Sequence, residues 1–502
     1  MDLNKDFKKA GPNVGVGLSF NITVMKYLFR TLFVLLIGAV LSSCSKQDPD
    51  ILSLLFNIVS FPGEGGKDEV SFITNRSWTA SSDQDWLNIK PSSGDASSSS
   101  QVISMVAMKN ETEQPREATV IVNAGTIAKS IRITQAGAPR FTIADFKAKK
   151  ADKVTWYKLT GEIASIANES YGNFYIFDET GYVYVYGLGE KKVESNDQSF
   201  AKLDLKAGDT VTMMTLRSEH NGLIEAGGTI PAYFVSKTDG TYKLGKKVSS
   251  TSAGWLELPA TSAADGQDLL IHTFPDGSRN YAAYWDYKNL VATWVAYPLC
   301  AANIGTSGGR TDSFSLDPLL PRDKQPYIPS AFKTGNVPGS FDRGHQIPSA
   351  DRLNWRVNLE TFFGTNMTPQ DNGLNGNTWG NLENKVRTWA KSSSTDTLYV
   401  VTGCTGADAE AKYVLDYENK HIAIPSGYYK ALLRLGKDKT YMALGIYFDN
   451  VSSNVTSFKS YSMSVDELEK KVGVDFFVNL PDDVEKNVEA VNPADESWWW
   501  NN

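Results

Sequence analysis

Cysteine and histidine are scarce in this chain, with three cysteines and four histidines among 502 residues. They do not form a group with the spacing of a structural zinc site. The apolar run "TLFVLLIGAV" near the start has about ten residues, half of what a helix needs to span a bilayer. These shortages argue against a zinc-stabilised domain and against a membrane-spanning helix in this run.

Surplus positive charge is also absent, because the formal net charge is −7. No overall basic field therefore attracts a polyanion or an anionic membrane, and such a partner would need local cations or a metal ion. Hydrophobic residues make up 41% and charged residues 21%, which is ordinary for a globular protein. The length exceeds that of a single core, so we expect about three domains.

The first 43 residues have the pattern of a bacterial export signal. Met25 opens a short basic stretch, "MKYLFR", and the apolar run follows it. Leu41-Ser42-Ser43-Cys44 resembles a lipobox, in which the cysteine becomes the lipidated first residue. We expect residues 1–43 to be a signal region, with Met25 as the true start and Cys44 as the lipid anchor of an outer-membrane lipoprotein, periplasmic or cell-surface. The alternatives are an uncleaved signal anchor and a free thiol.

In the segment 44–137, short strand-like runs fill residues 51–137 after the anchor, with Gly, Ser, Asn and Pro between them at intervals of about ten residues. Trp78, Trp86, Gly94, Arg116 and the closing "TQAG" resemble the BACON domain, an immunoglobulin-like module. The resemblance implies an Ig-type β-sandwich, with a glycan as a candidate partner. No aromatic cluster suited to sugar is evident, so a spacer role is the favoured interpretation.

Residues 138–250 are again mostly strand-like and predict a five-stranded β-barrel similar to an OB-fold. In "YVYVY", Tyr182, Tyr184 and Tyr186 share one face of a strand. These rings predict either a stacking platform for unpaired bases or half-buried tyrosines with hydrated hydroxyls, and the second interpretation is favoured.

Residues 251–502 mix strands with helices and predict an α+β domain. "NTWGNLENKVRTWAKS" has helical spacing from about Thr378, and "SVDELEKKVG" predicts a second helix with a capping box at Ser464. Cys300 and Cys404 each end an apolar, strand-like run. They predict either a disulfide between neighbouring strands or two buried free thiols.

The most specific motif in this region is "FDRGHQIPSADR" together with the residues after it. His345 closes an Asp-Arg-Gly-His sequence, and Asn366, Asn375, Glu383 and Arg387 follow it. In residue type and in spacing from His345, this set resembles the DNA/RNA non-specific endonuclease family. The resemblance implies a ββα-metal nuclease domain at residues 251–502 that cleaves DNA, RNA or both.

The residue types suit phosphodiester hydrolysis on their own chemistry. A histidine with an ordinary pKa near 6.5 can take a proton from water at physiological pH, which predicts a rate that rises as His345 becomes neutral. An amide oxygen such as that of Asn375 suits Mg²⁺ better than zinc. Glu383 follows Asn375 by a little over two helical turns and Arg387 lies one turn further, so one helix face presents all three.

The resemblance also implies roles for individual residues. Asn375 is the direct metal ligand, and Glu383 holds metal-bound water. Asn366 orients the site, while Arg343 and Arg387 contact phosphate. The cofactor implied is Mg²⁺, with Mn²⁺ as a substitute. A buried Arg-His pair capping a strand, with asparagines as turn formers, would explain parts of this pattern but not all of its spacings.

The chain departs from the family at one position. Relatives often carry an arginine shortly before the strand that reads "WVAY", where this chain has residues 290–293, "LVAT". Lys288 and Arg310 are the candidates to replace it. The sequence thus predicts an exported, lipid-anchored, Mg²⁺-dependent endonuclease. The alternative is a carbohydrate-binding or adhesion lipoprotein with a catalytically inert nuclease-like domain.

Overall fold

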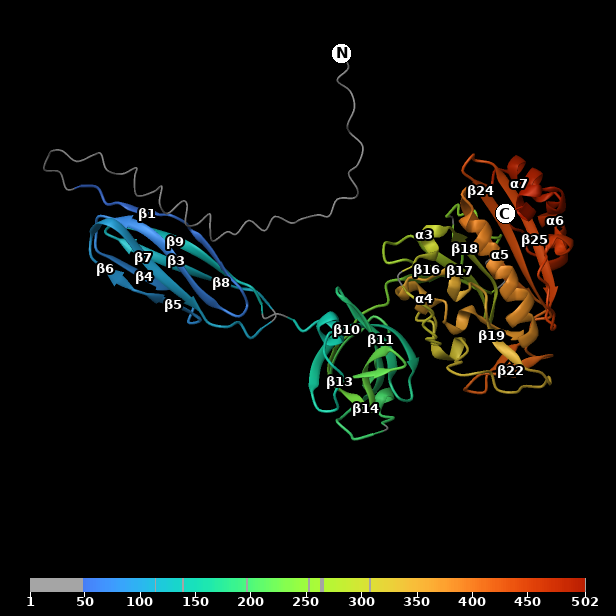
Figure 1. The fold of residues 1–502 in the computed structure, drawn as a ribbon, viewed down its shortest axis with the longest axis horizontal. Coiled ribbons are helices and arrows are strands. Elements are labelled where there is room, and N and C mark those ends of the chain that lie inside the picture. Colours follow the sequence, from blue (N-terminus) through green and yellow to red (C-terminus); the bar gives the residue numbers. More distant parts are fainter. Residues whose placement is uncertain are drawn as a thin grey trace, which may run out of the picture. The chain divides into compact units, whose positions relative to one another are not determined.

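The computed structural model describes residues 48–112, 114–137, 140–195, 197–251, 253–261, 266–306 and 308–501. The expected signal region, Met25 and Cys44 lie outside these ranges. Across the described ranges, no helix combines the length and the apolar character that crossing a membrane requires. The chain divides into two compact units, one ending at Arg140 and one beginning at Phe141 (Figure 1).

The first unit contains two β-sheets with a shared hydrophobic core. The four-stranded sheet has the order β1 (Leu52–Leu54), β3 (Gly66–Thr74), β7 (Ser97–Ala107) and β5 (Leu87–Lys90). The five-stranded sheet has the order β2 (Ile58–Phe61), β9 (Ile127–Gln135), β8 (Arg116–Ala124), β4 (Trp78–Ser82) and β6 (Ser93–Gly94). All neighbouring strands are antiparallel except β2 and β9.

The residues that characterise this segment in the sequence pack together in two places. A Cβ on Gly94 would lie 2.7 Å from the Trp78 ring, so only glycine lets β6 pair so closely with β4. The Arg116 guanidinium lies 4.4 Å from the centroid of the Trp86 ring, and its Nε donates a hydrogen bond to Gln135 Oε1 at 2.8 Å. The tryptophan, glycine and arginine positions noted in the sequence of this segment are therefore explained by their packing within the first unit.

The second unit begins with a closed five-stranded barrel. Its strand order is β10 (Trp156–Asn168), β11 (Asn173–Asp178), β12 (Gly181–Gly189), β14 (Leu223–Thr238) and β13 (Thr210–His220). The pair β12–β14 is parallel and the other pairs are antiparallel. A short helix, α2 (Ile143–Lys147), packs on β10 and β12, where it buries Ile143 and Phe146.

An eight-stranded antiparallel sheet forms the rest of this unit. Its order is β15 (Gly245–Val248), β16 (Asp268–Thr273), β17 (Arg279–Asp286), β18 (Val291–Leu299), β21 (Thr395–Thr405), β24 (Gly427–Gly436), β25 (Tyr441–Asp449) and β26 (Ser462–Met463). Its central strands are buried on both faces, so they read as continuous apolar runs. Leu432 of β24 faces the core that contains α5 (Gly380–Lys391), and Leu433 faces the core under α6 (Val465–Val472).

The barrel packs against α4 (Trp355–Glu360) through aromatic side chains. Tyr182 stacks on Trp355 with ring centroids 4.1 Å apart, and Tyr184 packs on its barrel neighbour Tyr175 at 4.8 Å in the cluster that includes Leu359 of α4. Only Tyr186 of the three alternating tyrosines is exposed, at 47%. The idea of a three-ring stacking platform is therefore wrong, because two of the rings are half-buried in this interface.

Cys300 and Cys404 are free thiols, so the disulfide interpretation is wrong. They lie at the ends of β18 and β21, which are antiparallel neighbours, and the register places Leu299 opposite Leu398 and Trp294 opposite Gly403. The two cysteines are therefore about seven residues apart along the sheet, roughly 24 Å, whereas a disulfide needs Cα atoms within about 7 Å. Burial raises the pKa of the Cys404 thiol to about 12.

The tryptophan-rich end of the described chain packs on α5. Trp499 is fully buried, and its ring lies 4.9 Å from that of Trp389. The Trp389 indole N–H donates a hydrogen bond to the Trp499 carbonyl at 2.7 Å. Residues 497–501 thus cover the outer side of the helix that the sequence assigns to the site.

Candidate active site

The DRGH sequence forms the first strand of a ββα unit. β19 (Phe341–His345) pairs antiparallel with β20 (Met367–Asp371), and the helical segment that ends in α5 follows directly. A Cβ on Gly344 would lie 2.5 Å from Gln370 Oε1, so a side chain there would collide with the neighbouring strand. The glycine of the motif is therefore required by strand pairing, and it leaves His345 at the strand end.

The helix begins earlier than its sequence periodicity indicates. A π-helical turn, η6 (Leu374–Trp379), precedes α5, so Asn375 lies inside the helical segment and not before it. Such π-turns are frequent at functional sites, because the widened turn redirects side chains. The simple count of helical turns from Asn375 to Glu383 therefore does not apply.

His345 lies among aromatic rings and cations. Its ring makes edge-to-face contact with Phe362 at 4.9 Å, and no atom of the described residues forms a hydrogen bond with its buried Nε2. Burial lowers the pKa of His345 to about 3, with further lowering by Arg310 and Arg343, while a hydrogen bond with the Arg343 backbone opposes the shift. The imidazole is thus neutral at physiological pH, and its Nε2 has no partner among the described residues. So low a pKa makes it a weak base until an anionic group beside Arg310 and Arg343 offsets their charge and raises that pKa.

Asn366 supports the backbone just beyond His345. Its side-chain oxygen accepts a hydrogen bond from the Ile347 N–H at 2.9 Å, and its amide nitrogen donates to the carbonyls of Ile347 and Thr361 at 3.0 and 2.7 Å. The residue is fully buried. All of its polar atoms are used in these contacts, so it positions the end of β19 and does not face a substrate.

Asn375 is oriented by the first residue of the motif. Its amide nitrogen donates a hydrogen bond to Asp342 Oδ2 at 2.9 Å, and the other carboxylate oxygen accepts from Asn372. With the nitrogen engaged, the amide oxygen of Asn375 is the atom available to a metal ion. The sequence analysis gave Asp342 no role, although its place in the motif was a signal.

Glu383 lies on α5 beside a buried lysine. Burial raises the pKa of Glu383, and Asp351 raises it further, whereas Lys430, Arg387 and Arg310 lower it. Lys430 is fully buried, and its Nζ donates a hydrogen bond to Thr402 Oγ1 at 2.7 Å. Lys430 was not among the residues predicted from the sequence, although a lysine inside the apolar run "GYYKALLRL" is an unusual feature.

The two arginines expected to bind phosphate are both anchored. Arg387 Nη1 forms an ion pair with Asp351 Oδ1 at 2.8 Å, and Asp351 also accepts a hydrogen bond from the Tyr297 hydroxyl at 2.9 Å. Arg343 lies over the Phe314 ring at 3.2 Å and donates a hydrogen bond to the Ile328 carbonyl at 3.0 Å. These contacts fix the guanidinium positions before any substrate binds.

Arg310, and not Lys288, lies where its charge acts on the site. Its guanidinium is 4.9 Å from the centroid of the Phe362 ring that also contacts His345, and its charge lowers the pKa of both His345 and Glu383. Arg310 forms an ion pair with Asp312 at 2.7 Å, and Lys288 forms one with Glu410 at 3.5 Å. Arg310, unlike Lys288, acts on the pKa values of His345 and Glu383. Of the two candidates from the sequence, Arg310 is the one that could supply the displaced family arginine.

Asn375 and Glu383 each carry an oxygen donor suited to a hard divalent cation. The amide oxygen of Asn375 and the carboxylate of Glu383 are of the type that Mg²⁺ takes from proteins, with water or phosphate completing its shell. No cysteine and no second histidine is among the residues described around His345, so the donors are not those that a soft metal prefers.

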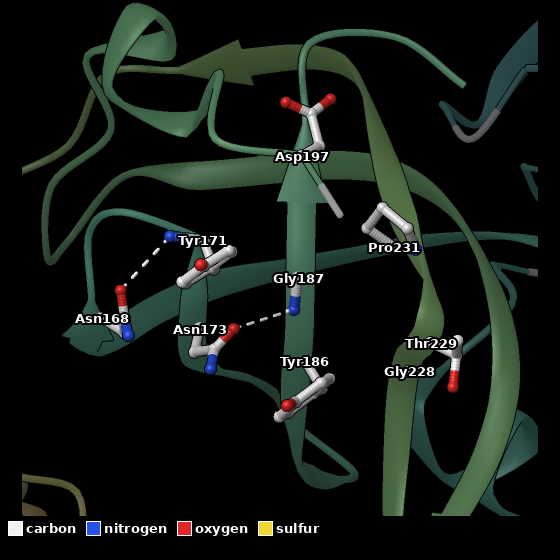
Figure 2. Close-up of a pocket in the computed structure, with 9 residues that line it drawn as sticks. All are labelled: Asn168, Tyr171, Asn173, Tyr186, Gly187, Asp197, Gly228, Thr229 and Pro231. Atoms are coloured by element: carbon white, nitrogen blue, oxygen red, sulfur yellow. Dashed lines mark hydrogen bonds between the residues drawn. The ribbon is translucent and has the colours of Figure 1, made fainter. Parts of the chain in front are cut away.

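A separate polar pocket lies on the barrel. It has a volume of about 490 Å³ and is lined by the aromatic rings of Tyr171 and Tyr186 together with Asn168, Asn173 and Asp197 (Figure 2). Asn173 Oδ1 accepts a hydrogen bond from the Gly187 N–H at 3.0 Å, which holds the amide in the pocket wall. None of the residues that line it belongs to the His345 site.

Comparisons with known proteins identify relatives of two parts of the chain. A family model described as DNA/RNA non-specific endonuclease matches residues 265–483, and one described as Viral BACON domain matches residues 56–138. A nuclease of Nostoc sp. is 30% identical over 219 residues, covering 42% of this chain and 75% of that protein. A nuclease of Serratia marcescens is 28% identical over 200 residues, covering 40% and 73%. The human mitochondrial nuclease EXOG is 26% identical over 215 residues, covering 40% and 56%.

The family match includes the strand pair, the π-helical turn and α5, and therefore every residue placed around His345. With its ββα unit and the neutral imidazole at the end of the first strand, this chain belongs to the DNA/RNA non-specific endonuclease family.

Proposed function

We propose that this protein is a Mg²⁺-dependent endonuclease that hydrolyses phosphodiester bonds in DNA, RNA or both with little sequence preference. The observation that carries the proposal is the buried Nε2 of His345, which is neutral and without a partner among the described residues, between Arg310 and Arg343. A proton acceptor beside two fixed cations suits the attack of water on an anionic phosphodiester.

In this mechanism each residue has a separate task. His345 takes the proton from the attacking water, and Asn366 holds the strand end that carries it. Arg310 and Arg343 balance the negative charge that grows on the phosphate oxygens. Asn375, oriented by Asp342, and Glu383 would hold the metal ion. When bound, Mg²⁺ would stabilise the leaving oxygen and the added charge of the transition state.

The buried Lys430 has a supporting task. Its charge favours the ionised form of Glu383, which burial disfavours. Arg387 does the same, and its ion pair with Asp351 keeps it in place. The net charge of −7 leaves substrate attraction to local cations such as Arg310 and Arg343, so binding should be weak and sensitive to salt.

The test is cleavage of supercoiled plasmid and of single-stranded RNA by the purified chain in Mg²⁺, with EDTA as the control. His345→Ala should lower the rate by about 10² to 10⁴. His220→Ala is the matched control, because His220 is an exposed histidine of the barrel and should leave the rate unchanged. Full activity in EDTA, or a His345→Ala variant that retains most activity, would overturn the proposal.

The anchoring and the remaining domains are proposed separately. We propose that Cys44 is lipidated and holds the protein in the outer membrane, where the BACON segment acts as an Ig-like spacer and the barrel as an OB-like domain. The strand order of the barrel, with its one parallel pair, supports the last point. Labelling with palmitate tests the anchor, because label that survives Cys44→Ala would exclude it.

A further inference from the structure

A second group of acidic side chains lies on the other face of the eight-stranded sheet. α6 and α7 (Asp482–Glu489) both pack on β25, and α6 contributes to the core opposite the one that contains α5 (Figure 1). Asp466 and Glu469 lie one turn apart on α6, and Glu489 is the last residue of α7. One carboxylate oxygen from each lies within 4.8 Å of the others.

The environment of Glu489 is unfavourable for an isolated carboxylate. The residue is only 4% exposed, and no atom of the described chain forms a hydrogen bond with its buried Oε1. Within the described residues, no lysine, arginine or histidine pairs with Asp466, Glu469 or Glu489. Burial raises the pKa of Glu489 to about 9, and the charges of Glu469, Glu485 and Asp466 add to the shift.

Three carboxylates in contact need a compensating positive charge, because like charges at this distance repel and a buried, unpaired carboxylate is costly. The structure provides no cationic side chain for this. The compensating positive charge is therefore either a proton shared among the three groups or a bound cation. The orphaned Oε1 of Glu489 points to the cation, because a shared proton would form a hydrogen bond between two of the carboxyl groups.

We propose that Asp466, Glu469 and Glu489 bind a divalent cation, and that this cation is Ca²⁺. Ca²⁺ takes several carboxylate oxygens at about 2.3 to 2.6 Å in a flexible geometry. Mg²⁺ requires a near-ideal octahedron, usually keeps several waters and takes only one or two carboxylates. Three carboxylates from two helices, with one oxygen of each within 4.8 Å of the others, therefore favour Ca²⁺.

This site is independent of the nuclease site. Glu489 lies beyond residue 483, where the match to the nuclease family model ends, and none of the three residues interacts with His345, Asn375 or Glu383. The cation would fix the end of α7 to the first turns of α6. We therefore expect it to act on stability and not on the chemistry of cleavage.

The experiment measures thermal unfolding of the full chain after EDTA treatment and again after addition of CaCl₂ or MgCl₂ at constant ionic strength. In CaCl₂ the wild-type Tm should rise by several degrees, and Asn375→Ala, which removes the proposed nuclease metal ligand, should show the same rise. Glu489→Gln should show no rise, and in EDTA it should be about as stable as the wild type, because without a cation the Glu489 carboxyl, with a pKa of about 9, is already uncharged at neutral pH.

Asp483→Asn is the matched control, since Asp483 is an exposed acidic residue of the same helix, and its response to CaCl₂ should equal that of the wild type. Equilibrium dialysis should give one Ca²⁺ per Asn375→Ala chain and none when Glu489→Gln is added. The proposal is overturned if CaCl₂ shifts the Tm of wild type and Glu489→Gln equally or shifts neither. The proposal is also overturned if MgCl₂ raises the wild-type Tm as much as CaCl₂ does.

Discussion

Neutralising a histidine by burial changes how the site responds to acid. With its pKa lowered to about 3, His345 remains neutral when the pH falls through 6.5, so its protonation does not limit the rate near neutrality. Glu383 has a raised pKa and must be ionised to hold metal-bound water. Any loss of rate between pH 8 and pH 5 is therefore expected from Glu383.

Lys430→Met tests this assignment. The charge of Lys430 lowers the pKa of Glu383, so its removal should raise that pKa, and a higher pH is then needed to ionise the carboxyl group. The acid side of the pH–rate profile should move to higher pH by about one unit or more. Lys288→Met is the control, because Lys288 is paired with Glu410 and should leave the profile unchanged. Identical profiles for all three proteins would contradict the role of Lys430.

Arg310 should carry the task of the displaced family arginine. Arg310→Ala should lower the cleavage rate by about 10² to 10³ in saturating Mg²⁺, as expected for loss of one charge that stabilises the transition state. Lys288→Ala should have little effect. The reverse ranking in a steady-state plasmid assay would show that Lys288 supplies the charge.

At the residue scale, the motif was readable from sequence because each member has a chemical reason for its type. The structural roles of Gly344 and Asn366, by contrast, could not be predicted from the sequence. Their roles depend on Gln370 of the neighbouring strand and on the Ile347 and Thr361 backbone. Lys430 and Asp342 were missed because spacing does not reveal which charges meet once the sheet has formed.

Among the secondary-structure elements, α5 depends on the segment that covers it. Trp499→Ala should destabilise the protein by about 3 to 5 kcal/mol, as is typical for a fully buried tryptophan. Urea unfolding followed by tryptophan fluorescence measures the change. Val491→Ala, at a position 37% exposed, should cost far less. Equal effects of the two substitutions would show that residues 497–501 do not contribute to the core.

Cys300 and Cys404 show that the direction of two neighbouring strands determines whether their cysteines can form a disulfide. Denatured, unreduced protein should have two titratable thiols, from Cys300 and Cys404, when Cys44 is absent from the expressed chain. One Ellman titration is sufficient. A count of zero would mean that β18 and β21 are not paired in the observed register. The sequence located both strands but carried no information on which of their ends are adjacent.

At the scale of the whole molecule, the barrel is tied to the nuclease part by several specific contacts. Tyr182 stacks on Trp355, and the Tyr242 hydroxyl donates a hydrogen bond to Glu360 Oε1 at 2.7 Å. Trp355→Ala should loosen this interface, so calorimetry should show the barrel unfolding at a lower temperature than in the wild type, apart from the nuclease part. Trp255→Ala, outside this interface, is the control. An unchanged thermogram for Trp355→Ala would mean that the stacking contributes little.

The contact between Trp389 and Trp499 also determines how late in synthesis the segment that covers α5 becomes available. The two residues are 110 positions apart, and a ribosome adds about 5 to 20 residues per second, so the partner of Trp389 emerges roughly 5 to 20 s later. Until then the outer side of α5 is bare, and Trp389 lacks the ring and the carbonyl that cover it. A chain that stops short of Trp499 therefore leaves the helix that carries Glu383 without its cover.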